Sequence, residues 1–402
     1  MDFRDTPEDA AFRKEVQAFL VTEQPSRDGD EARSAYQAAS QGGPEAMDRY
    51  QKWMKKLASK GWIAPAWPVE YGGAGMSIMQ QFVFNEELAK ARAPRPGGIG
   101  IAMAGPTIIV YGSGEQKKEH LSGMLSGDVI WCQGFSEPGS GSDLASLQTS
   151  AVKDGDDYVV NGQKIWTSGA QYAQRMILLA RTDPQAPKHK GISYFLLDMK
   201  SPGVTVRPLV NMANTPGFNE VFFDNVRIPA KDLLGEENRG WYVGTTTLDF
   251  ERSSIGTSVA QTNAVEDLVL FVRGRGGDLH PTLKLELAER AIEAETARLL
   301  SYRVITLQNR GMVPNHEASA IKLYAGELGQ RVASTGLKLA GLYGMLDGRS
   351  KLGPEHSANR YTPNRGKFVR SYLNAVAGTI AGGTSEVQRN IIAGRGLGLP
   401  RD

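Results

Sequence analysis

Two short segments combine glycine, hydroxyl and aromatic residues in a way that suits a flat, anionic cofactor. The first, residues 132–143, reads CQGFSEPGSGSD. Gly139 and Gly141 allow backbone amides to approach a ligand closely, and Ser136 and Ser142 add hydroxyl groups. The loop could therefore bind an anion or the polar edge of a ring. The alternative is a plain glycine-serine turn, which is the commoner meaning of GxG when no βαβ pattern follows it.

The second segment, residues 163–169, reads QKIWTSG. Trp166 offers a flat stacking surface, and the hydroxyl groups of Thr167 and Ser168 follow it directly, so the segment suits an aromatic cofactor. A tryptophan packed in the core on a strand is the alternative.

A carboxylate on a predicted helix is the strongest candidate for acid-base chemistry. Glu251 lies three residues after Leu248 and four before Ile255, which places it on the stripe that those apolar side chains would bury. Burial raises the pKa of a carboxyl group and makes the carboxylate a stronger base, as proton abstraction requires. A structural ion pair with an arginine is the alternative, although Arg252 lies about 100° away around the helix.

Near the carboxyl end, residues 380–389 read IAGGTSEVQR, which predicts a glycine turn followed by a helix that Thr384 caps. The first amides of such a helix are unpaired and carry its positive dipole end, so a phosphate or an adenine ring could bind there. An ordinary capped helix without a ligand is the alternative.

The local patterns divide the chain into three parts that must position these segments. Residues 1–128 show helical spacing, as at Phe12 and Val16; residues 129–236 show runs of strand length; and residues 237–402 return to helical patterns. We therefore predict an α+β fold. Its domains are an all-helical N-terminal domain, a central antiparallel sheet or small β-barrel, and a helical C-terminal domain.

Two finer predictions concern the sheet and the longest helix. Asn161-Gly162 is the strongest short hairpin signal, because both turn residues must adopt positive φ, and Asp154-Gly155 is another. Residues 282–310 contain neither glycine nor proline and predict one long helix. Its packed face would consist of Leu285, Ala288, Ile292, Leu299 and Tyr302.

The composition excludes several classes of function. The chain has 402 residues, of which 41% are hydrophobic and 22% charged, and its net charge is +2. It is therefore globular and lacks the basic footprint of a nucleic-acid partner. Its single cysteine, Cys132, excludes a disulfide framework and favours the cytoplasm, and with no HExxH among the histidines we expect no metal site. No apolar stretch approaches the roughly 18 residues that span a bilayer, so we expect no membrane insertion.

Several longer stretches, taken together, resemble the acyl-CoA dehydrogenases. They are GWIAPAWPVEYGGAG (61–75), YGSGEQKKEHL (111–121), FSEPGSGSDLASLQTSAVKDGDDYVVNGQKIWTSG (135–169), VFFDNVRIP (221–229), GEENRGW (235–241) and GGTSEVQRNII (382–392). The resemblance implies a helical domain, a β domain and a C-terminal four-helix bundle, in the order that the local patterns predict. It also implies an oxidoreductase of lipid catabolism with FAD as cofactor, an acyl-CoA thioester as substrate and electron-transfer flavoprotein as electron acceptor.

The resemblance further implies roles for individual residues. The cofactor would be held by the segment after Cys132, the tryptophan segment and the terminal turn, through Gln133, Phe135, Ser136, Gly141, Ser142, Trp166, Thr167, Ser168, Gly383, Thr384 and Glu386. The substrate would contact Ser142, Asp249, Arg252 and Gly382.

The family places its catalytic base at one of two positions. In the commoner pattern a glutamate precedes the Gly-Thr of the terminal turn, and here that position is Gly382, which cannot abstract a proton. In the other pattern the glutamate belongs to a Glu-Arg dipeptide on a helix, where this chain has Glu251. Glu251 is therefore the expected base both from its place on the helix and from the family pattern. It would remove the α proton while the β hydrogen leaves as hydride to flavin N5, and the amide of Gly382 would help to polarise the thioester carbonyl.

The chain departs from the family pattern in its C-terminal half. The usual Arg-x-x-Phe-Gly segment is not recognisable around residues 272–281, and KLAG at 338–341 replaces Gln-x-x-Gly-Gly. These departures resemble a bacterial subgroup that includes the large subunit of pimeloyl-CoA dehydrogenase and the steroid side-chain dehydrogenases. A homodimer or homotetramer and a heterotetramer with a paralogous subunit both stay open. So do a catalytic subunit for steroid side-chain or dicarboxylic acyl-CoA, a non-catalytic paralogue, and an oxidase or monooxygenase of the same fold.

Overall fold

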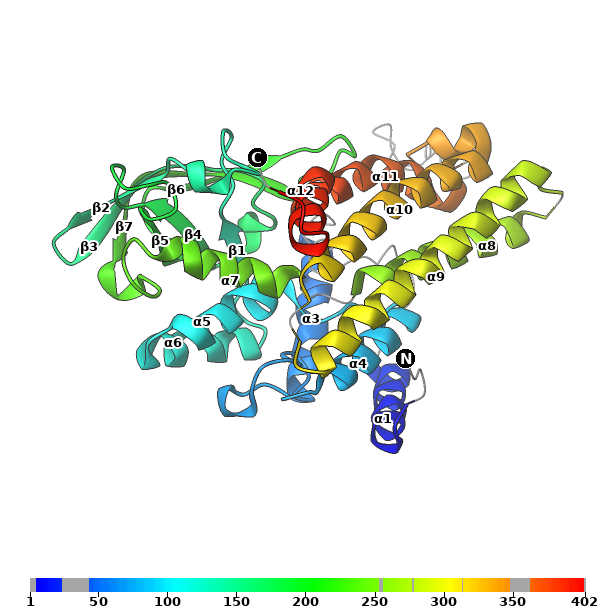
Figure 1. The fold of residues 1–402 in the computed structure, drawn as a ribbon, viewed down its shortest axis with the longest axis horizontal. Coiled ribbons are helices and arrows are strands. Elements are labelled where there is room, and N and C mark those ends of the chain that lie inside the picture. Colours follow the sequence, from blue (N-terminus) through cyan, green and yellow to red (C-terminus); the bar gives the residue numbers. More distant parts are fainter. Residues whose placement is uncertain are drawn as a thin grey trace.

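The computed structural model describes residues 5–23, 43–252, 256–276, 278–312, 314–347 and 362–400, without the side chains of residues 249–259 and 365. Helices occupy both ends of the chain, and one sheet lies between them in the sequence and at one side of the molecule (Figure 1). The predicted α+β order of helix, sheet and helix is confirmed.

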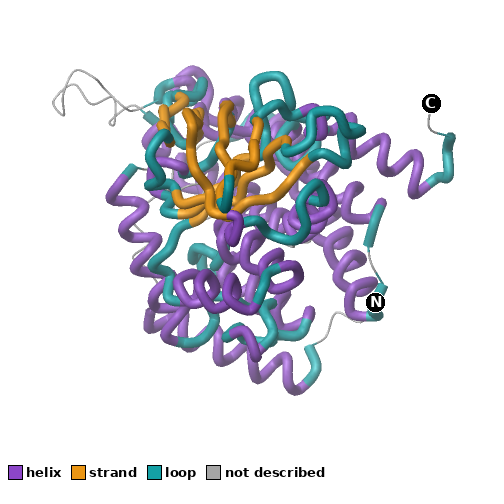
Figure 2. The backbone as a smooth tube through the Cα atoms, turned by 90° about the vertical axis from the view of Figure 1, so that its left-hand side faces the viewer, coloured by secondary structure: helices purple, strands orange, loops and turns teal. Residues whose placement is uncertain are grey.

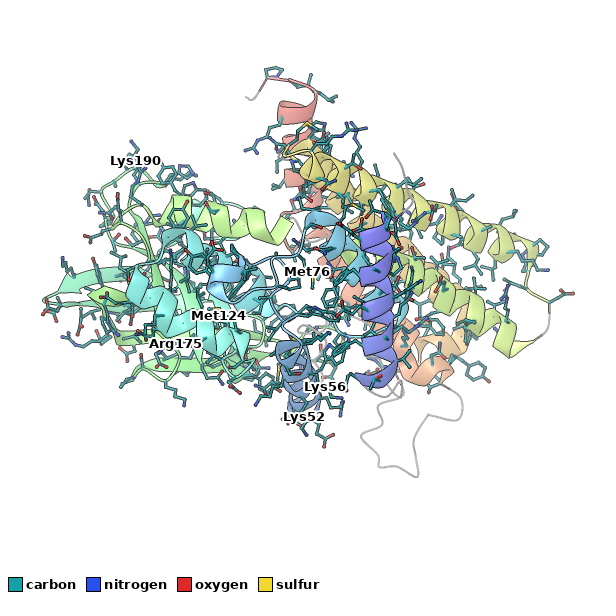
Figure 3. All side chains as sticks on the ribbon, turned by 90° about the horizontal axis from the view of Figure 1, so that it is seen from below. Lys52, Lys56, Met76, Met124, Arg175 and Lys190 are labelled. Carbon is teal, nitrogen blue, oxygen red and sulfur yellow. The ribbon has the colours of Figure 1, made fainter. Side chains whose placement is uncertain are left out.

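The helices before the sheet pack around one apolar core. They are α1 (Pro7–Glu23), α3 (Pro44–Ser59), α4 (Ile78–Lys90), α5 (Gly105–Tyr111) and α6 (Gly114–Leu125), with the short π-helix η2 (Gly100–Ala104) before α5. Helical spacing explains their burial: Trp53 and Leu57 of α3 are buried, whereas Lys52 and Lys56 lie on the outer face (Figure 3). The same core includes Trp131 and Val243, so it joins these helices to the sheet and to the first helix after it.

Seven strands form one curled sheet (Figure 2). They are β1 (Trp131–Gly134), β2 (Ser150–Asp154), β3 (Asp157–Lys164), β4 (Arg175–Arg181), β5 (Ile192–Asp198), β6 (Val204–Leu209) and β7 (Phe218–Pro229). Their order is β1-β4-β2-β3-β7-β6, with β5 also paired to β4. The hairpin pairs are antiparallel as predicted, but β1 runs parallel to β4. The long connection through β2 and β3 makes this pairing possible.

One predicted hairpin turn is confirmed and the other is wrong. The chain turns at Gly155, whose φ is 62°, between the paired strands β2 and β3. Asn161 and Gly162 instead lie inside β3, where the register against β7 shifts between Val160 and Gly162 as in a β-bulge. A Cβ at Gly162 would approach the Cα of Thr149 to 2.7 Å. Glycine is therefore needed here because two backbone segments approach each other closely within the sheet, and not because the chain turns.

The helices after the sheet are α7 (Gly240–Arg252), α8 (Gly256–Arg275), α9 (Pro281–Asn309), α10 (His316–Ala340), α11 (Lys367–Ala375) and α12 (Ser385–Ile391). The long helix predicted over 282–310 is confirmed, but its predicted packed face is wrong. Ala294 and Ala297 face the core, whereas Leu285 and Ile292 are 73% and 69% exposed. Among the described residues no helix is both long and apolar enough to cross a membrane.

Helix α7 lies against the sheet and connects it to the helical parts. A Cβ at Gly240 would lie 2.4 Å from the carbonyl carbon of Ser193 in β5, so only glycine allows the helix to begin directly on the strand. Farther along, the hydroxyl of Thr247 meets those of Thr107 on α5 at 2.9 Å and Tyr194 on β5 at 3.3 Å. These contacts fix the last turns of α7 between the sheet and the N-terminal helices.

Candidate active site

The two predicted cofactor segments at the ends of β1 and β3 lie side by side. In the sheet, β4 and β2 separate these strands, yet the backbone amide of Ile165 donates a hydrogen bond to the carbonyl of Ser136 over 2.9 Å. The ammonium of Lys164 also donates to the carbonyl of Phe135 over 3.0 Å. The curl of the sheet therefore brings together loops that the strand order keeps apart.

A buried ion pair holds these two loops to each other. Lys164 Nζ lies 2.7 Å from Glu137 Oε1, and both side chains are buried. Glu137 also accepts hydrogen bonds from the backbone amides of Gln148 at 2.6 Å and Thr149 at 2.9 Å. Burial acts to raise the pKa of Glu137, but the ammonium and these donors outweigh it and hold the pKa below its ordinary value.

This pair was not predicted from the sequence, although both residues stand within the stretch that carries the family resemblance. Lysine and glutamate are almost never fully buried unless they are paired. Nothing in the local pattern around Lys164 marks it as an exception, and its partner is 27 residues away in the sequence.

Trp166 combines an unusual backbone with an exposed ring. Its φ is 60°, in the left-handed region that side chains other than glycine rarely adopt. Its side chain is 59% exposed, and its edge contacts Phe218, with ring centroids 6.1 Å apart. The alternative of a core tryptophan is therefore wrong. The backbone turns a flat apolar surface outward, next to the loop after β1.

Two buried polar groups beside these loops have no hydrogen-bond partner among the described residues: Nε2 of Gln133 and Oγ1 of Thr167. The backbone of Thr167 is paired, because its amide and its carbonyl both bond to Asn219 at 3.0 Å. A buried polar group without a partner costs about 1–3 kcal/mol. These two groups and the exposed indole fit a planar cofactor with polar ring edges, as FAD has.

The tip of the first cofactor loop is exposed to solvent. Gly141 and Ser142 are exposed and Ser136 is half-buried. A Cβ at Gly141 would meet nothing within 4 Å, so packing does not require glycine there. Phe135 is buried, with its ring edge against Tyr194 at a centroid distance of 5.9 Å.

The predicted base, Glu251, belongs to α7, the helix that is linked to the first cofactor loop by contacts between side chains. Glu251 is in the last turn of the helix, four residues after Thr247, and residues four apart share a helix face. Thr247 contacts Tyr194, which in turn contacts Phe135 of the first loop. The side chains of Asp249, Glu251 and Arg252 lie outside the described residues, so their predicted roles stay predictions.

The terminal turn has the predicted local structure. Gly382 and Gly383 have φ of 65° and 88°, and Thr384 caps α12 by accepting a hydrogen bond from the amide of Val387 at 3.2 Å. A Cβ at Gly383 would lie 2.5 Å from Nε2 of Gln388. That amide also donates to the carbonyl of Gly382 at 3.2 Å, so the side chain of Gln388 holds the turn closed.

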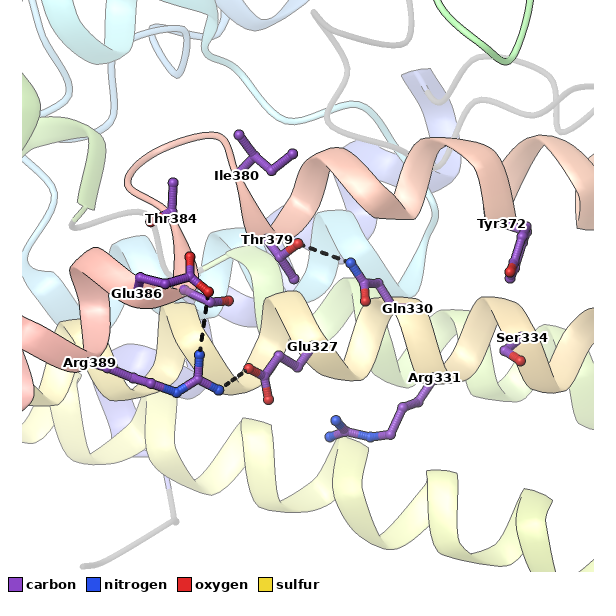
Figure 4. Close-up of a pocket in the computed structure, with 11 residues that line it drawn as sticks. Glu327, Gln330, Arg331, Ser334, Tyr372, Thr379, Ile380, Thr384, Glu386 and Arg389 are labelled. Carbon is purple, nitrogen blue, oxygen red and sulfur yellow. Dashed lines mark hydrogen bonds and ion pairs between the residues drawn. The ribbon is translucent and has the colours of Figure 1, made fainter. Parts of the chain in front are cut away.

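This turn borders a pocket of about 740 Å³ against α10 (Figure 4). Arg389 lies 2.5 Å from Glu327 and 4.0 Å from the exposed Glu386. Gln330 donates to Thr379 over 3.0 Å. A polar pocket of this volume suits a ligand of nucleotide size. Its residues belong to helices and to the terminal turn, whereas the other predicted cofactor segments lie at the ends of strands.

One group of possible metal ligands lies elsewhere and was not predicted. Ligand atoms of Glu119, His120 and Asp232 lie within 4.8 Å of one another. Burial lowers the pKa of His120 and raises that of Asp232. Lys231 and Arg175 already approach Glu119 to 3.4 and 3.5 Å, so two fixed positive charges oppose a cation there.

Comparison with known proteins covers nearly the whole chain. Family models for the acyl-CoA dehydrogenase N-terminal, middle and C-terminal domains match residues 6–128, 132–226 and 238–397. The acyl-CoA dehydrogenase IpdE1 of Mycobacterium tuberculosis is 36% identical over 372 residues, which cover 90% of this chain and 92% of that protein.

Solved structures agree with this match. One titled Tcur3481-Tcur3483 steroid ACAD has a TM-score of 0.85 and 34% identity over the full length of both chains. The ChsE4-ChsE5 complex from Mycobacterium tuberculosis has a TM-score of 0.82 and 33% identity, again over both full lengths. The chain therefore belongs to the acyl-CoA dehydrogenase family of flavoprotein oxidoreductases.

Proposed function

We propose that this protein catalyses the FAD-dependent α,β-dehydrogenation of an acyl-CoA thioester to the trans-2-enoyl-CoA. The observation that carries the proposal is the meeting of the loops after β1 and β3, where an exposed indole lies beside buried polar groups that have no hydrogen-bond partner in the described part of the chain. Family membership supports the reaction class.

Anaerobic titration with straight, branched, ω-carboxy and steroid acyl-CoA thioesters tests this function. At least one should bleach the flavin absorbance and yield the 2-enoyl-CoA. A protein that holds FAD but is bleached by none of them would contradict the proposal. Slow reoxidation of the bleached protein in air would count against an oxidase or a monooxygenase.

In this proposal FAD is held by residues of both loops and of the terminal turn. Bound FAD supplies the hydride acceptor at N5. Trp166 stacks against the ring system, Thr167 and Gln133 satisfy their buried polar groups on it, and the remaining contacts come from Phe135, Ser136, Gly141, Ser142, Ser168, Gly383, Thr384 and Glu386. The pocket beside Glu386 supports a nucleotide end at the terminal turn.

Thr167→Val should separate cofactor binding from folding. Removing a buried hydroxyl that pairs with none of the described residues should leave the free energy of unfolding of the FAD-free protein unchanged or higher. Loss of one hydrogen bond to the cofactor should weaken FAD binding about two- to tenfold. Fluorescence titration with FAD and thermal unfolding of the apoprotein measure the two effects.

Thr205→Val, at an exposed position of β6, is the matched control and should change neither quantity. If Thr167→Val destabilised the apoprotein and left FAD affinity intact, the hydroxyl would have a structural role and no contact with the cofactor.

The proton chemistry is assigned to Glu251. The α C–H of a thioester is a weak acid, so the base must be close to it and the carbonyl must be polarised as enolate charge develops. The backbone amide of Gly382 is a donor for that carbonyl, and preorganised donors of this kind are worth about 3–4 kcal/mol. Ser142, Asp249 and Arg252 are proposed to contact the substrate.

An oligomer is part of the proposal, with electron-transfer flavoprotein as electron acceptor. Leu285, Ile292 and Leu299 of α9 form an exposed apolar stripe, at 73%, 69% and 40% exposure. These residues recur every two turns on one helix face, and exposed apolar residues gathered on one face indicate a protein interface. Either a homodimer or homotetramer, or a heterotetramer with a paralogous subunit, would cover it.

Ile292→Glu should therefore lower the molar mass of the particle in solution, because a charge in an apolar interface is desolvated without a partner. Light scattering measures this mass. Ala291→Glu introduces the same charge at an exposed position about 100° away around the helix and should leave the mass unchanged. If both variants and the parent had the same molar mass, the apolar stripe of α9 would not be part of the subunit interface.

A second candidate is the catalytic subunit of a heteromer for steroid side-chain or dicarboxylic acyl-CoA. The similar structures bear titles that pair two proteins, and one names a steroid substrate class. A subunit purified alone should then hold less than one FAD per chain, whereas a homo-oligomer should hold one. Glu251 argues against a non-catalytic paralogue. The cytoplasmic location and domain boundaries at 128/129 and 236/237 stay predictions.

A further inference from the structure

The left-handed turn at Trp166 lies where strand β3 leaves the sheet. The antiparallel register of β3 with β7 reaches Lys164 opposite Val221, so its continuation would place Trp166 opposite Asn219. The chain departs from that course at Ile165, whose amide bonds to the first cofactor loop, and Trp166 then has a φ of 60°. A backbone conformation of this kind persists only where the surrounding structure holds it.

Asn219 of β7 holds both backbone polar groups of the residue that follows the turn. The amide of Thr167 donates a hydrogen bond to the carbonyl of Asn219 over 3.0 Å. Nδ2 of the Asn219 side chain donates in return to the carbonyl of Thr167, also over 3.0 Å, and to Oε1 of Gln171 over 2.5 Å. Because one residue pairs with both groups of Thr167, the backbone after Trp166 is restrained against rotation.

The partners of the Asn219 side chain determine its orientation. Both groups that face Nδ2 are oxygen acceptors, because Gln171 uses its own Nε2 to donate to the carbonyl of Pro216 over 3.2 Å. A reversed Asn219 amide would therefore place its oxygen against two other oxygens.

The orientation leaves the other polar atom of this side chain without a contact. Asn219 is fully buried, yet its Oδ1 has no hydrogen-bond partner among the residues that the structure describes. A buried acceptor of this kind destabilises a fold. What Nδ2 holds, and not a gain in stability, therefore explains an asparagine at this position.

Further contacts tie the turn to the same part of the chain. The amide of Gly169 donates to the carbonyl of Gly217 over 3.2 Å, and Phe218 presents its ring to the edge of Trp166. Phe218 is half-buried and Trp166 is exposed, whereas Asn219 is buried. Residues 216–219 therefore support the loop after β3, and Asn219 is the side chain that restrains it from inside the protein.

We infer that Asn219 is a positioning residue for the flavin: its carboxamide fixes the backbone of Thr167, so that the indole of Trp166 and the hydroxyl of Thr167 are presented together to the ring system. This inference rests on the proposed function, in which both residues contact FAD. The exposed indole and the buried hydroxyl without a described partner belong to consecutive residues. A rotation of the backbone between them would therefore displace both groups.

Dilution of the FAD-loaded protein, which gives the FAD dissociation constant, and circular dichroism of the bound flavin at visible wavelengths test this role. Asn219→Leu has a side chain of similar size that cannot donate, so the carbonyl of Thr167 loses its partner. The variant should bind FAD about ten- to hundredfold more weakly than the parent. At saturating FAD its flavin dichroism should also differ, because the groups around the ring have moved.

A double variant separates positioning from a general structural role. In protein that already carries Thr167→Val, Asn219→Leu should weaken FAD binding by a smaller factor than in the parent, because one of the groups that Asn219 positions is absent. Equal factors in the two backgrounds would assign Asn219 to the fold alone and overturn the inference. An Asn219→Leu protein with the FAD affinity and flavin dichroism of the parent would overturn it as well.

Asn219→Asp keeps the shape of the side chain but turns an oxygen toward two acceptors. It should weaken FAD binding as Asn219→Leu does, and it serves if the leucine variant does not fold. Asn225→Asp is the matched control: it makes the same change at an exposed position of β7 and should alter neither quantity. If the parent bound FAD but no thioester reduced it, the proposed function would fail, and FAD affinity and dichroism would still decide the role of Asn219.

Discussion

Glu251→Gln should lower the rate of flavin reduction by acyl-CoA about 10²- to 10⁴-fold, the range that a positioned general base contributes. The amide keeps the shape of the side chain but cannot accept the α proton. Because no contact of this residue with the cofactor is proposed, FAD content and thermal stability should equal those of the parent. Stopped-flow absorbance under anaerobic conditions measures the rate.

Glu266→Gln is the matched control. It removes a carboxylate from an exposed position on α8 and should leave the rate unchanged. A Glu251→Gln protein that reduces its flavin as fast as the parent would move the base to another residue or favour a non-catalytic paralogue. Binding of the unreactive S-octyl-CoA should be similar in both variants, which separates loss of proton transfer from loss of substrate binding.

Lys164→Met should lower the free energy of unfolding by about 3–5 kcal/mol, the cost of leaving a buried charge without its partner. The carboxylate of Glu137 would keep its two backbone donors but lose the ammonium 2.7 Å away. The same pair joins the two cofactor loops, so FAD affinity should fall with stability. Chemical denaturation and FAD titration measure these effects.

The double variant Lys164→Met with Glu137→Gln should recover part of the stability, because no buried charge then remains. Lys188→Met breaks a pair with Asp143 whose side chains are 51% and 58% exposed, and it should cost less than about 1 kcal/mol. If Lys188→Met and Lys164→Met cost the same, the buried pair would not be the element that fixes the loops.

The cofactor segments could be found from the sequence because their signals are local. Glycine, serine and tryptophan in short spacing suggested a ligand, and the capping pattern at Thr384 predicted a turn and a helix that the structure confirms. The family resemblance rests on such runs as well. It required no knowledge of which strands pair or which way the sheet curls.

Two wrong predictions share one cause: a local sequence pattern does not show which other segment or subunit packs against it. Asn161-Gly162 has the composition of a turn, but pairing with β7 carries the chain straight through it as a bulge. The apolar spacing on α9 correctly indicates a surface that needs burial, yet Leu285 and Ile292 face outward in the single chain. Such spacing does not distinguish burial within a chain from burial between subunits.

The sequence by itself determined the order of helix and strand regions, the family, and the residue types available for a flavin and a base. Periodicity and turn chemistry act over a few residues, so they survive without the fold. Only the tertiary structure decided that Lys164 meets Glu137 and that the ring of Trp166 is exposed. Burial and charge pairing depend on residues that are distant in the chain. They contribute to the free energy of folding only after the sheet has curled and the helices have packed.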